Sequence, residues 1–134
     1  MTDERYAAEE FSKARRALAD AERPVEVGGS SEGIVNRLYY ASFHAAQAAL
    51  YVQGVDPGSH GAVRNRFGEE IVLDGDATRE EGRLLTTLAD LRQRADYGYD
   101  RIDADVTVLA TRTENLVERM TTFIERTAED ADDE

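Results

Sequence analysis

The sequence predicts an all-α protein, an antiparallel bundle of four or five helices, and three observations support this prediction. Apolar residues recur at spacings of three and four along most of the chain, alternating strand-like runs are nearly absent, and Gly or Pro turns separate the periodic segments. With 134 residues and no cysteine, the chain has room for one modest core and no disulfide to brace it. We therefore expect a single helical domain.

The first two helices are expected at residues 3–21 and 31–53. The first begins at Thr2 or Asp3 as its N-cap, carries an apolar stripe at spacings of four and three, and ends before Pro24 and the glycines that follow. A pair of serines caps the second helix, whose apolar face is rich in alanine. Small side chains allow two helices to approach closely, so we expect this helix to pack tightly against its neighbours.

Three further helices complete the predicted bundle. A short helix occupies residues 59–72 with Ser59 as its cap, a fourth spans 77–95 with leucines on one side, and a fifth covers 103–127. The apolar seam of the fifth alternates by three and four, so it can pack along the whole bundle. We place the domain at residues 1–127 and expect residues 128–134 to form an acidic, disordered tail.

The charged residues of the chain indicate the salt conditions in which the protein works. The chain has 28 acidic and 16 basic residues, a formal net charge of -12, and Lys13 is its only lysine. Abundant carboxylates with arginine in place of lysine are typical of proteins in molar salt, which screens self-repulsion. We infer a salt-accumulating, haloarchaeal type of cytoplasm; the alternative is an ordinary acidic protein from a high-GC genome. The apolar stretches are far shorter than a membrane span, so we expect a cytoplasmic protein with no membrane partner.

The charge is unevenly distributed along the chain. Residues 34–73 carry three acids and three bases, whereas residues 103–134 carry ten acids and three bases. Bulk attraction to nucleic acid is excluded by the net charge, so any contact with an anionic ligand has to be local. The central arginines can form such a local positive patch: Arg37, Arg64, Arg66, Arg92 and Arg94.

The residues that carry chemistry are arginines, tyrosines and two histidines. The chain has no HExxH motif, no cysteine and no Gly-rich phosphate loop before a lysine. We therefore expect no metal and no cofactor, and we do not expect an ATPase or a zinc hydrolase. The polar residues suited to catalysis gather instead in the second to fourth helices.

Three short motifs in this region resemble the HEPN domain family. They occur in the family's order and lie within a resemblance that spans roughly residues 5–125. The motifs are Arg37-Leu38-Tyr39-Tyr40-Ala41-Ser42-Phe43, His60-Gly61-Ala62-Val63 and Arg92-Gln93-Arg94-Ala95-Asp96-Tyr97.

The resemblance implies a helical bundle that forms a homodimer and is often encoded beside a minimal nucleotidyltransferase. Many members are toxins or metal-independent RNases whose signature is an Arg, four to six residues, a His and often a Tyr. Here Arg92 occupies the Arg position, Tyr97 stands in place of the His, and Tyr99 occupies the Tyr position. In related toxins the partner nucleotidyltransferase adenylylates the signature tyrosine, so Tyr99 is the first candidate acceptor and Tyr97 the second.

Cleavage of RNA without a metal needs a base for the 2′-hydroxyl, a cation for the phosphorane and an acid for the leaving oxygen. Arg92 is the expected cation and Asp96 a candidate base, and Tyr97 is a further candidate catalytic residue in the place of the signature His. His44 or His60 can act as acid or base if the fold brings either beside Arg92. RNA or nucleotide binding is expected to use the residues that could contact phosphates: Arg37, His60, Arg64 and Arg94.

Each assignment has a structural alternative. Arg92 and Asp96 are four residues apart and can form a simple helix ion pair, while His44 can be an interior histidine held by a hydrogen bond. His60 can cap or pack the third helix, and the tyrosines can be core or interface aromatics. Three functions therefore remain open: a toxin-like RNase paired with a nucleotidyltransferase, a non-catalytic module that binds nucleotide, RNA or a partner, and a structural bundle.

Overall fold

The helices follow one another in the order that the sequence predicts. The computed structural model describes the backbone of residues 2–98 and 102–132 and the side chains of residues 6–98 and 102–130. No strand occurs in these described ranges, and the all-α prediction is confirmed. The elements are α1 (Thr2–Val27), α2 (Ser31–Val52), α3 (His60–Phe67), the π-helical turn η1 (Gly68–Val72), α4 (Arg79–Tyr97) and α5 (Val106–Asp132).

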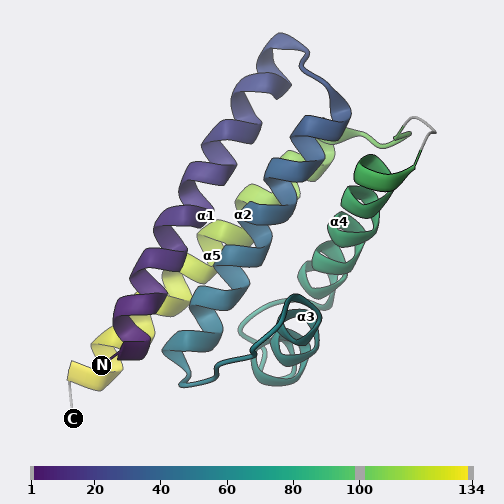
Figure 1. The fold of residues 1–134 in the computed structure, drawn as a ribbon. Coiled ribbons are helices and arrows are strands. Elements are labelled where there is room, and N and C mark those ends of the chain that lie inside the picture. Colours follow the sequence, from purple (N-terminus) through teal and green to yellow (C-terminus); the bar gives the residue numbers. More distant parts are fainter. Residues whose placement is uncertain (1, 99–101, 133–134) are drawn as a thin grey trace.

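The second helix, α2, is the centre of the bundle. It packs against α1, α3, α4 and α5. Figure 1 shows α1 and α2 as antiparallel neighbours, α5 behind them, and α4 on the side of α2 away from α1, with α3 near the end where α4 begins. The topology brings the start of α1 and the end of α5 to the same end of the bundle (Figure 1). The face of α2 that looks toward α3 and α4 carries the candidate site.

Alanine allows α2 to lie at the centre. Ala45 and Ala49 of α2, like Ala14 and Ala21 of α1, are fully buried. Methyl side chains keep the distance between helix axes short, and the many close contacts gain dispersion energy. The expectation of tight packing along the alanine-rich helix is therefore met by a core that includes both helices.

The first helix does not end before Pro24, as the sequence analysis expected, but continues to Val27. Proline removes one backbone N–H and crowds the carbonyl four residues earlier, yet a single lost hydrogen bond near a helix end does not prevent one more turn. Gly28 then ends the helix with a φ of 76°, a conformation that glycine adopts without strain. The N–H of Gly29 donates to the Pro24 carbonyl at 2.6 Å.

The last helix extends beyond its predicted end. α5 runs to Asp132 and not to residue 127, so residues 128–132 are helical rather than a disordered tail. Extending an established helix costs little, and alanine and glutamate are strong helix formers. The acidic composition of this segment indicated solvent exposure, which Ala128, Glu129 and Asp130 show, but not disorder.

The caps of the middle helices follow the sequence closely. The side chains of Ser30 and Ser59 accept backbone hydrogen bonds at the starts of α2 and α3. The third helix reaches Val72 as expected, although its second half widens into η1. Thr78 caps α4, which begins two residues later than expected. In the described part of the chain, no helix is both long enough and apolar enough to cross a membrane.

Candidate functional site

An aromatic cluster joins α2 to the start of α3. Tyr39 and Phe43 are buried, one helical turn apart on α2. The ring of His60, the first residue of α3, stacks on Phe43 with 4.1 Å between ring centroids. Its Nδ1 lies 3.0 Å from the Tyr39 hydroxyl, so one hydrogen bond and one stacking contact fix the position of the imidazole. The Ser59 cap places His60 at this point by starting α3 there.

Arg92 of α4 lies over the same cluster. Its guanidinium carbon is 4.9 Å from the centroid of the Tyr39 ring and 5.2 Å from that of Tyr40. Such stacking of a cation on an aromatic face is favourable because the ring carries negative charge density on its face. The Nε of Arg92 lies 3.5 Å from a carboxylate oxygen of Asp96, which is an ion pair but not a close hydrogen bond. Arg92 is therefore oriented mainly by the two rings.

These residues line a small cleft of about 220 Å³ between α2, α3 and α4. It brings two arginines, a histidine and two phenols to one place. The cleft is lined by Tyr39, His60, Arg64, Ala89, Arg92, Gln93 and Tyr97.

The surroundings change the proton affinity of two of these groups. The pKa of His60 is lowered by burial first, and then by the positive charge of Arg92 and the charge of His44. Burial raises the pKa of the Tyr39 phenol, and Arg92 opposes that shift. At neutral pH the His60 ring is therefore neutral, the protonation state in which an imidazole nitrogen can accept a proton.

His44 does not reach this cleft. Its ring stacks on Tyr40 with centroids 6.0 Å apart, and its Nδ1 pairs with the Glu10 carboxylate of α1. Because Arg92 also lies over Tyr40, the two predicted catalytic residues share an aromatic neighbour without meeting. His44 instead lines a second hollow, between α1 and α2, which we call the α1–α2 notch. This notch, of about 420 Å³, is lined by Lys13, Arg16, Ala17, Asp20, Arg37, Tyr40 and His44.

The other arginines of the predicted patch lie in different places. Arg64 lines the cleft, whereas Arg37 lines the α1–α2 notch, with its guanidinium carbon 5.3 Å from the Tyr40 centroid. Arg94 is exposed, and it follows Arg92 by two residues, which turns a helix by about 200° and directs the two side chains to different sides. Arg66 pairs with Glu70 of η1, at 3.1 Å. The expected single patch is thus not formed, because the cleft and the notch each take some of these arginines and Arg66 and Arg94 line neither hollow.

Of the two candidate acceptor tyrosines, only Tyr97 lies within the described residues. Tyr97, at the end of α4, is 80% exposed, so its hydroxyl is open to a second protein. Tyr99 lies outside the described residues, and its assignment stays a prediction. Asp96 is exposed and pairs with Arg92, which agrees with the helix ion pair that the spacing allowed.

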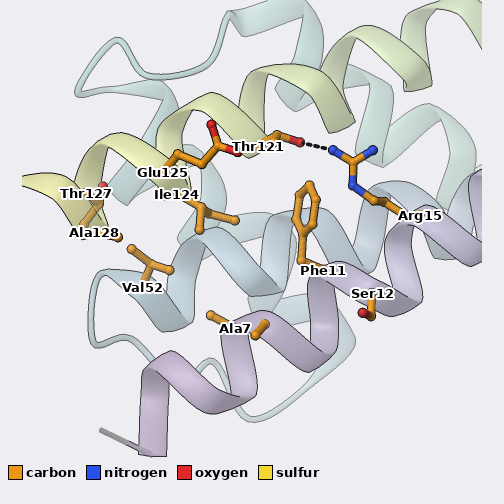
Figure 2. Close-up of a pocket in the computed structure, with 11 residues that line it drawn as sticks. Ala7, Phe11, Ser12, Arg15, Val52, Thr121, Ile124, Glu125, Thr127 and Ala128 are labelled. Carbon is orange, nitrogen blue, oxygen red and sulfur yellow. Dashed lines mark hydrogen bonds between the residues drawn. The ribbon is translucent and has the colours of Figure 1, made fainter.

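A separate groove of about 710 Å³ lies between α1, α2 and α5. Figure 2 shows Phe11 and Ile124 in this groove and the hydrogen bond from Arg15 to Thr121, which is 3.1 Å long. None of the residues predicted to act in chemistry lines it. Within the described residues, no group of three or more His, Asp or Glu is placed to hold a metal ion.

The motifs did not point to three residues at or beside the α1–α2 notch, namely Glu10, Lys13 and Arg16. They belong to α1, which none of the motifs includes, and Glu10 meets His44 across 34 positions of sequence. Residues that join only when two helices pack leave no local spacing signal. One feature of the sequence singles out α1, because Lys13 is the only lysine of the chain.

Comparison with known proteins gives a family match over nearly the whole chain. The sequence profile of the HEPN domain matches residues 7–130. A protein of Methanocaldococcus jannaschii named as a candidate toxin is 39% identical over 67 residues, half of this chain and half of that protein. A UPF0332 protein of Thermotoga maritima is 31% identical over 86 residues, 64% of each chain. A UPF0332 protein of Archaeoglobus fulgidus is 32% identical over 100 residues, 72% of this chain and 76% of the relative. The chain thus spans between half and two thirds of the length of the first two relatives.

Proposed function

The chain belongs to the HEPN domain family, and we propose that it is the toxin component of a toxin–antitoxin-like module, a metal-independent endoribonuclease. One observation carries this proposal: the cleft between α2, α3 and α4 brings His60 together with Arg64 and Arg92. The signature histidine is absent from α4, where Tyr97 stands, and His60 supplies an imidazole from α3 instead. The name of the Methanocaldococcus jannaschii relative supports the toxin assignment.

The cleft holds groups for each part of an RNA cleavage. When Nδ1–H of His60 donates to the Tyr39 oxygen, the Nε2 lone pair takes the proton of a ribose 2′-hydroxyl. The 2′ oxygen forms a bond to phosphorus, the bond from phosphorus to the 5′ oxygen breaks, and Arg92 and Arg64 stabilise the extra negative charge of the phosphorane. Tyr97 gives a proton to the leaving 5′ oxygen. The products are a 2′,3′-cyclic phosphate and a free 5′-hydroxyl.

The test is cleavage of a labelled RNA in the presence of a metal chelator. Removal of one general base or one electrostatic stabiliser costs on the order of 10² to 10³ in rate, so we expect losses of that size in His60→Gln and in Arg92→Gln. Arg94→Gln is the matched control, because this substitution removes the same charge from a different side of α4. Equal cleavage by wild type and Arg92→Gln would show that the activity does not reside in this cleft.

A second candidate function is RNA or nucleotide binding without chemistry. It is favoured by the stacking of Arg92 on two tyrosine rings, because a stacked guanidinium beside aromatic rings is also a platform for bases and phosphates. An oligonucleotide with 2′-O-methyl groups, which has no 2′-hydroxyl to deprotonate, measures binding alone. Binding of this analogue together with an intact all-ribose RNA after long incubation would select this second function.

The partner is proposed to be a minimal nucleotidyltransferase that modifies Tyr97 or Tyr99. The phenol oxygen attacks the α-phosphorus of ATP, the bond between the α- and β-phosphates breaks, pyrophosphate leaves, and the phenol proton goes to solvent. The exposure of the Tyr97 side chain supports access by an enzyme. Intact-mass measurement after co-expression with a neighbouring nucleotidyltransferase should show added AMP that is lost in Tyr97→Phe/Tyr99→Phe. An unchanged mass would remove this part of the proposal.

We also propose that the host cell accumulates salt and that the protein forms a homodimer. The excess of 28 acidic over 16 basic residues supports the first. The second rests on the family resemblance, and a twofold arrangement would allow the clefts of two copies to act together.

A further inference from the structure

The α1–α2 notch is a cationic surface in a strongly acidic protein. Three of its lining residues are basic (Lys13, Arg16 and Arg37), and one, Asp20, is acidic. The whole chain has a net charge of -12, so a local excess of positive charge stands out against its surroundings. Its volume of about 420 Å³ lies within the range of small-ligand sites.

His44 of the notch is held in place by Glu10, which lies beside it. The Glu10 carboxylate pairs with Nδ1 of His44, and the side chains of these two residues are only 14% and 18% exposed. Glu10 also lies 3.8 Å from the ammonium group of Lys13. In the described part of the chain Nε2 of His44 makes no hydrogen bond, so the ring is oriented through its Nδ1 contact with Glu10.

Tyr40 lines the notch and is also a neighbour of Arg92 in the cleft. Arg37, in the notch, and Arg92, in the cleft, both lie over its ring, at 5.3 and 5.2 Å from the centroid. Two cations that share one aromatic neighbour lie close enough together to contact neighbouring phosphates of a single strand.

We propose that the α1–α2 notch is a second phosphate subsite, which holds the phosphate next to the one bound in the cleft. The proposal rests on the proposed function in one respect, that the ligand is single-stranded RNA. Lys13 and Arg16 contribute charge, Arg37 and Tyr40 connect the two subsites, and Glu10 is a positioning residue that orients His44. Phosphate contacts of this kind hold a strand in register and carry no sequence preference.

The test measures binding of a 2′-O-methyl oligonucleotide, which cannot be cleaved, by fluorescence anisotropy over a series of salt concentrations. Each phosphate contact on a single strand contributes about 0.7 to the slope of log affinity against log salt. Because the notch is proposed to hold one phosphate, Lys13→Gln/Arg16→Gln should bind more weakly and lower the slope by up to about 0.7. The matched control is Arg79→Gln/Arg83→Gln, which changes the net charge equally at exposed positions of α4.

Two further measurements make the test specific to the notch. Asp20→Asn should raise the affinity, because it removes the only carboxylate that lines the hollow. Reductive methylation with carbon-13 labels Lys13 as the only lysine and keeps its charge, so its NMR signal should shift when the oligonucleotide is added. An equal titration with inorganic phosphate separates capture of a free anion from capture of a strand.

The outcomes distinguish the two proposals. If both double variants lose affinity equally and the Lys13 signal does not move, the notch is not a subsite, whatever the cleft does. If RNA stays intact but the oligonucleotide binds with the predicted slopes, the endoribonuclease proposal fails and the subsite stands. A wild type that binds no oligonucleotide overturns the subsite, while cleavage of all-ribose RNA still decides the endoribonuclease proposal, and a Lys13 signal that responds to inorganic phosphate alone overturns the assignment to RNA.

Discussion

Arg92 connects α4 to α2 through two aromatic rings and also lowers the pKa of His60. A guanidinium is planar and always charged, so it can stack on Tyr39 and still present its N–H groups to a phosphate. The family motif led us to expect Arg92 to act with Tyr97 on its own helix. In the structure Tyr39 of α2 and His60 of α3 line the same cleft as Arg92 and Tyr97.

We expect the pKa of His60, measured by NMR titration of its ring protons, to lie below the ordinary value of 6.5. Burial, Arg92 and His44 all disfavour the charged ring. Arg92→Gln removes one of these charges and should raise the pKa, whereas Arg94→Gln, on a different side of α4, should leave it nearly unchanged. A His60 pKa unaffected by Arg92→Gln would contradict the described contact.

The same shift makes stability depend on pH. A histidine whose pKa is lower in the folded protein binds fewer protons there than in the unfolded chain. Its contribution to stability is therefore fully present above pH 6.5 and is lost as the pH falls from 6.5 through the folded pKa. The difference in unfolding midpoint between wild type and His60→Gln should vary with pH in this window and be constant above it. A constant difference throughout would mean that the His60 pKa is not shifted by folding.

At the scale of the element, α4 starts with a capping box. The Thr78 side chain accepts from the Glu81 N–H at 3.1 Å, and the Glu81 carboxylate accepts from the Thr78 N–H at 2.8 Å. This capping box satisfies two backbone donors that a helix start otherwise leaves free. Glu81 is nearly buried and also pairs with Arg119 at 2.7 Å, which attaches the start of α4 to α5.

Thr78→Ala should lower the free energy of unfolding by about 1 kcal/mol, the typical cost of a lost N-cap. Thr87→Ala is the control, since Thr87 is exposed in the middle of the same helix and alanine favours a helix there. The measurement is the midpoint of unfolding in guanidinium chloride. If both variants unfold at the wild-type midpoint, the cap does not stabilise the folded protein.

At the scale of the whole molecule, repulsion between charges opposes the burial of the apolar core. The balance of the two determines how the stability of the fold depends on salt. Twelve uncompensated negative charges repel one another, and in dilute buffer this repulsion acts across the whole protein. Molar salt shortens the screening length to about 3 Å, so distant carboxylates no longer interact. The alanine-rich core around α2 contributes less apolar area per residue than a core of larger side chains.

We therefore expect the melting temperature to rise steadily as KCl increases from dilute buffer to molar concentration. Arg79→Gln/Arg83→Gln, which increases the net negative charge, should show a larger rise than wild type because it has more repulsion to screen. Differential scanning calorimetry measures both. A melting temperature independent of KCl would argue against adaptation to a salt-rich cytoplasm.

The proposed homodimer is tested by light scattering in molar KCl. We expect the mass of two chains, about twice 14.9 kDa. Dilution should release monomers with a parallel loss of cleavage if the clefts of two copies act together. A monomer that cleaves RNA fully would show that one cleft is sufficient.

Local sequence determined the parts of this protein that depend on local interactions. The order of the helices, the caps at Ser30 and Ser59 and the alanine-rich centre could all be inferred, because periodicity and capping act over a few residues. The two helix ends that were wrong, before Pro24 and at residue 127, lie where propagation of an existing helix outweighs a local breaker or an acidic composition.

Only the packing of the helices decided where the chemistry lies. His60 stands beside Arg92, and His44 beside Glu10 and Arg37, because α2 passes between α1 on one side and α3 and α4 on the other. Sequence spacing fixes the direction of a side chain on its own helix, but it carries no information about which helix will face it. The residues alone thus supplied the inventory of arginines, tyrosines and histidines, and their division into a cleft and a notch arose from burial of the apolar stripes against α2.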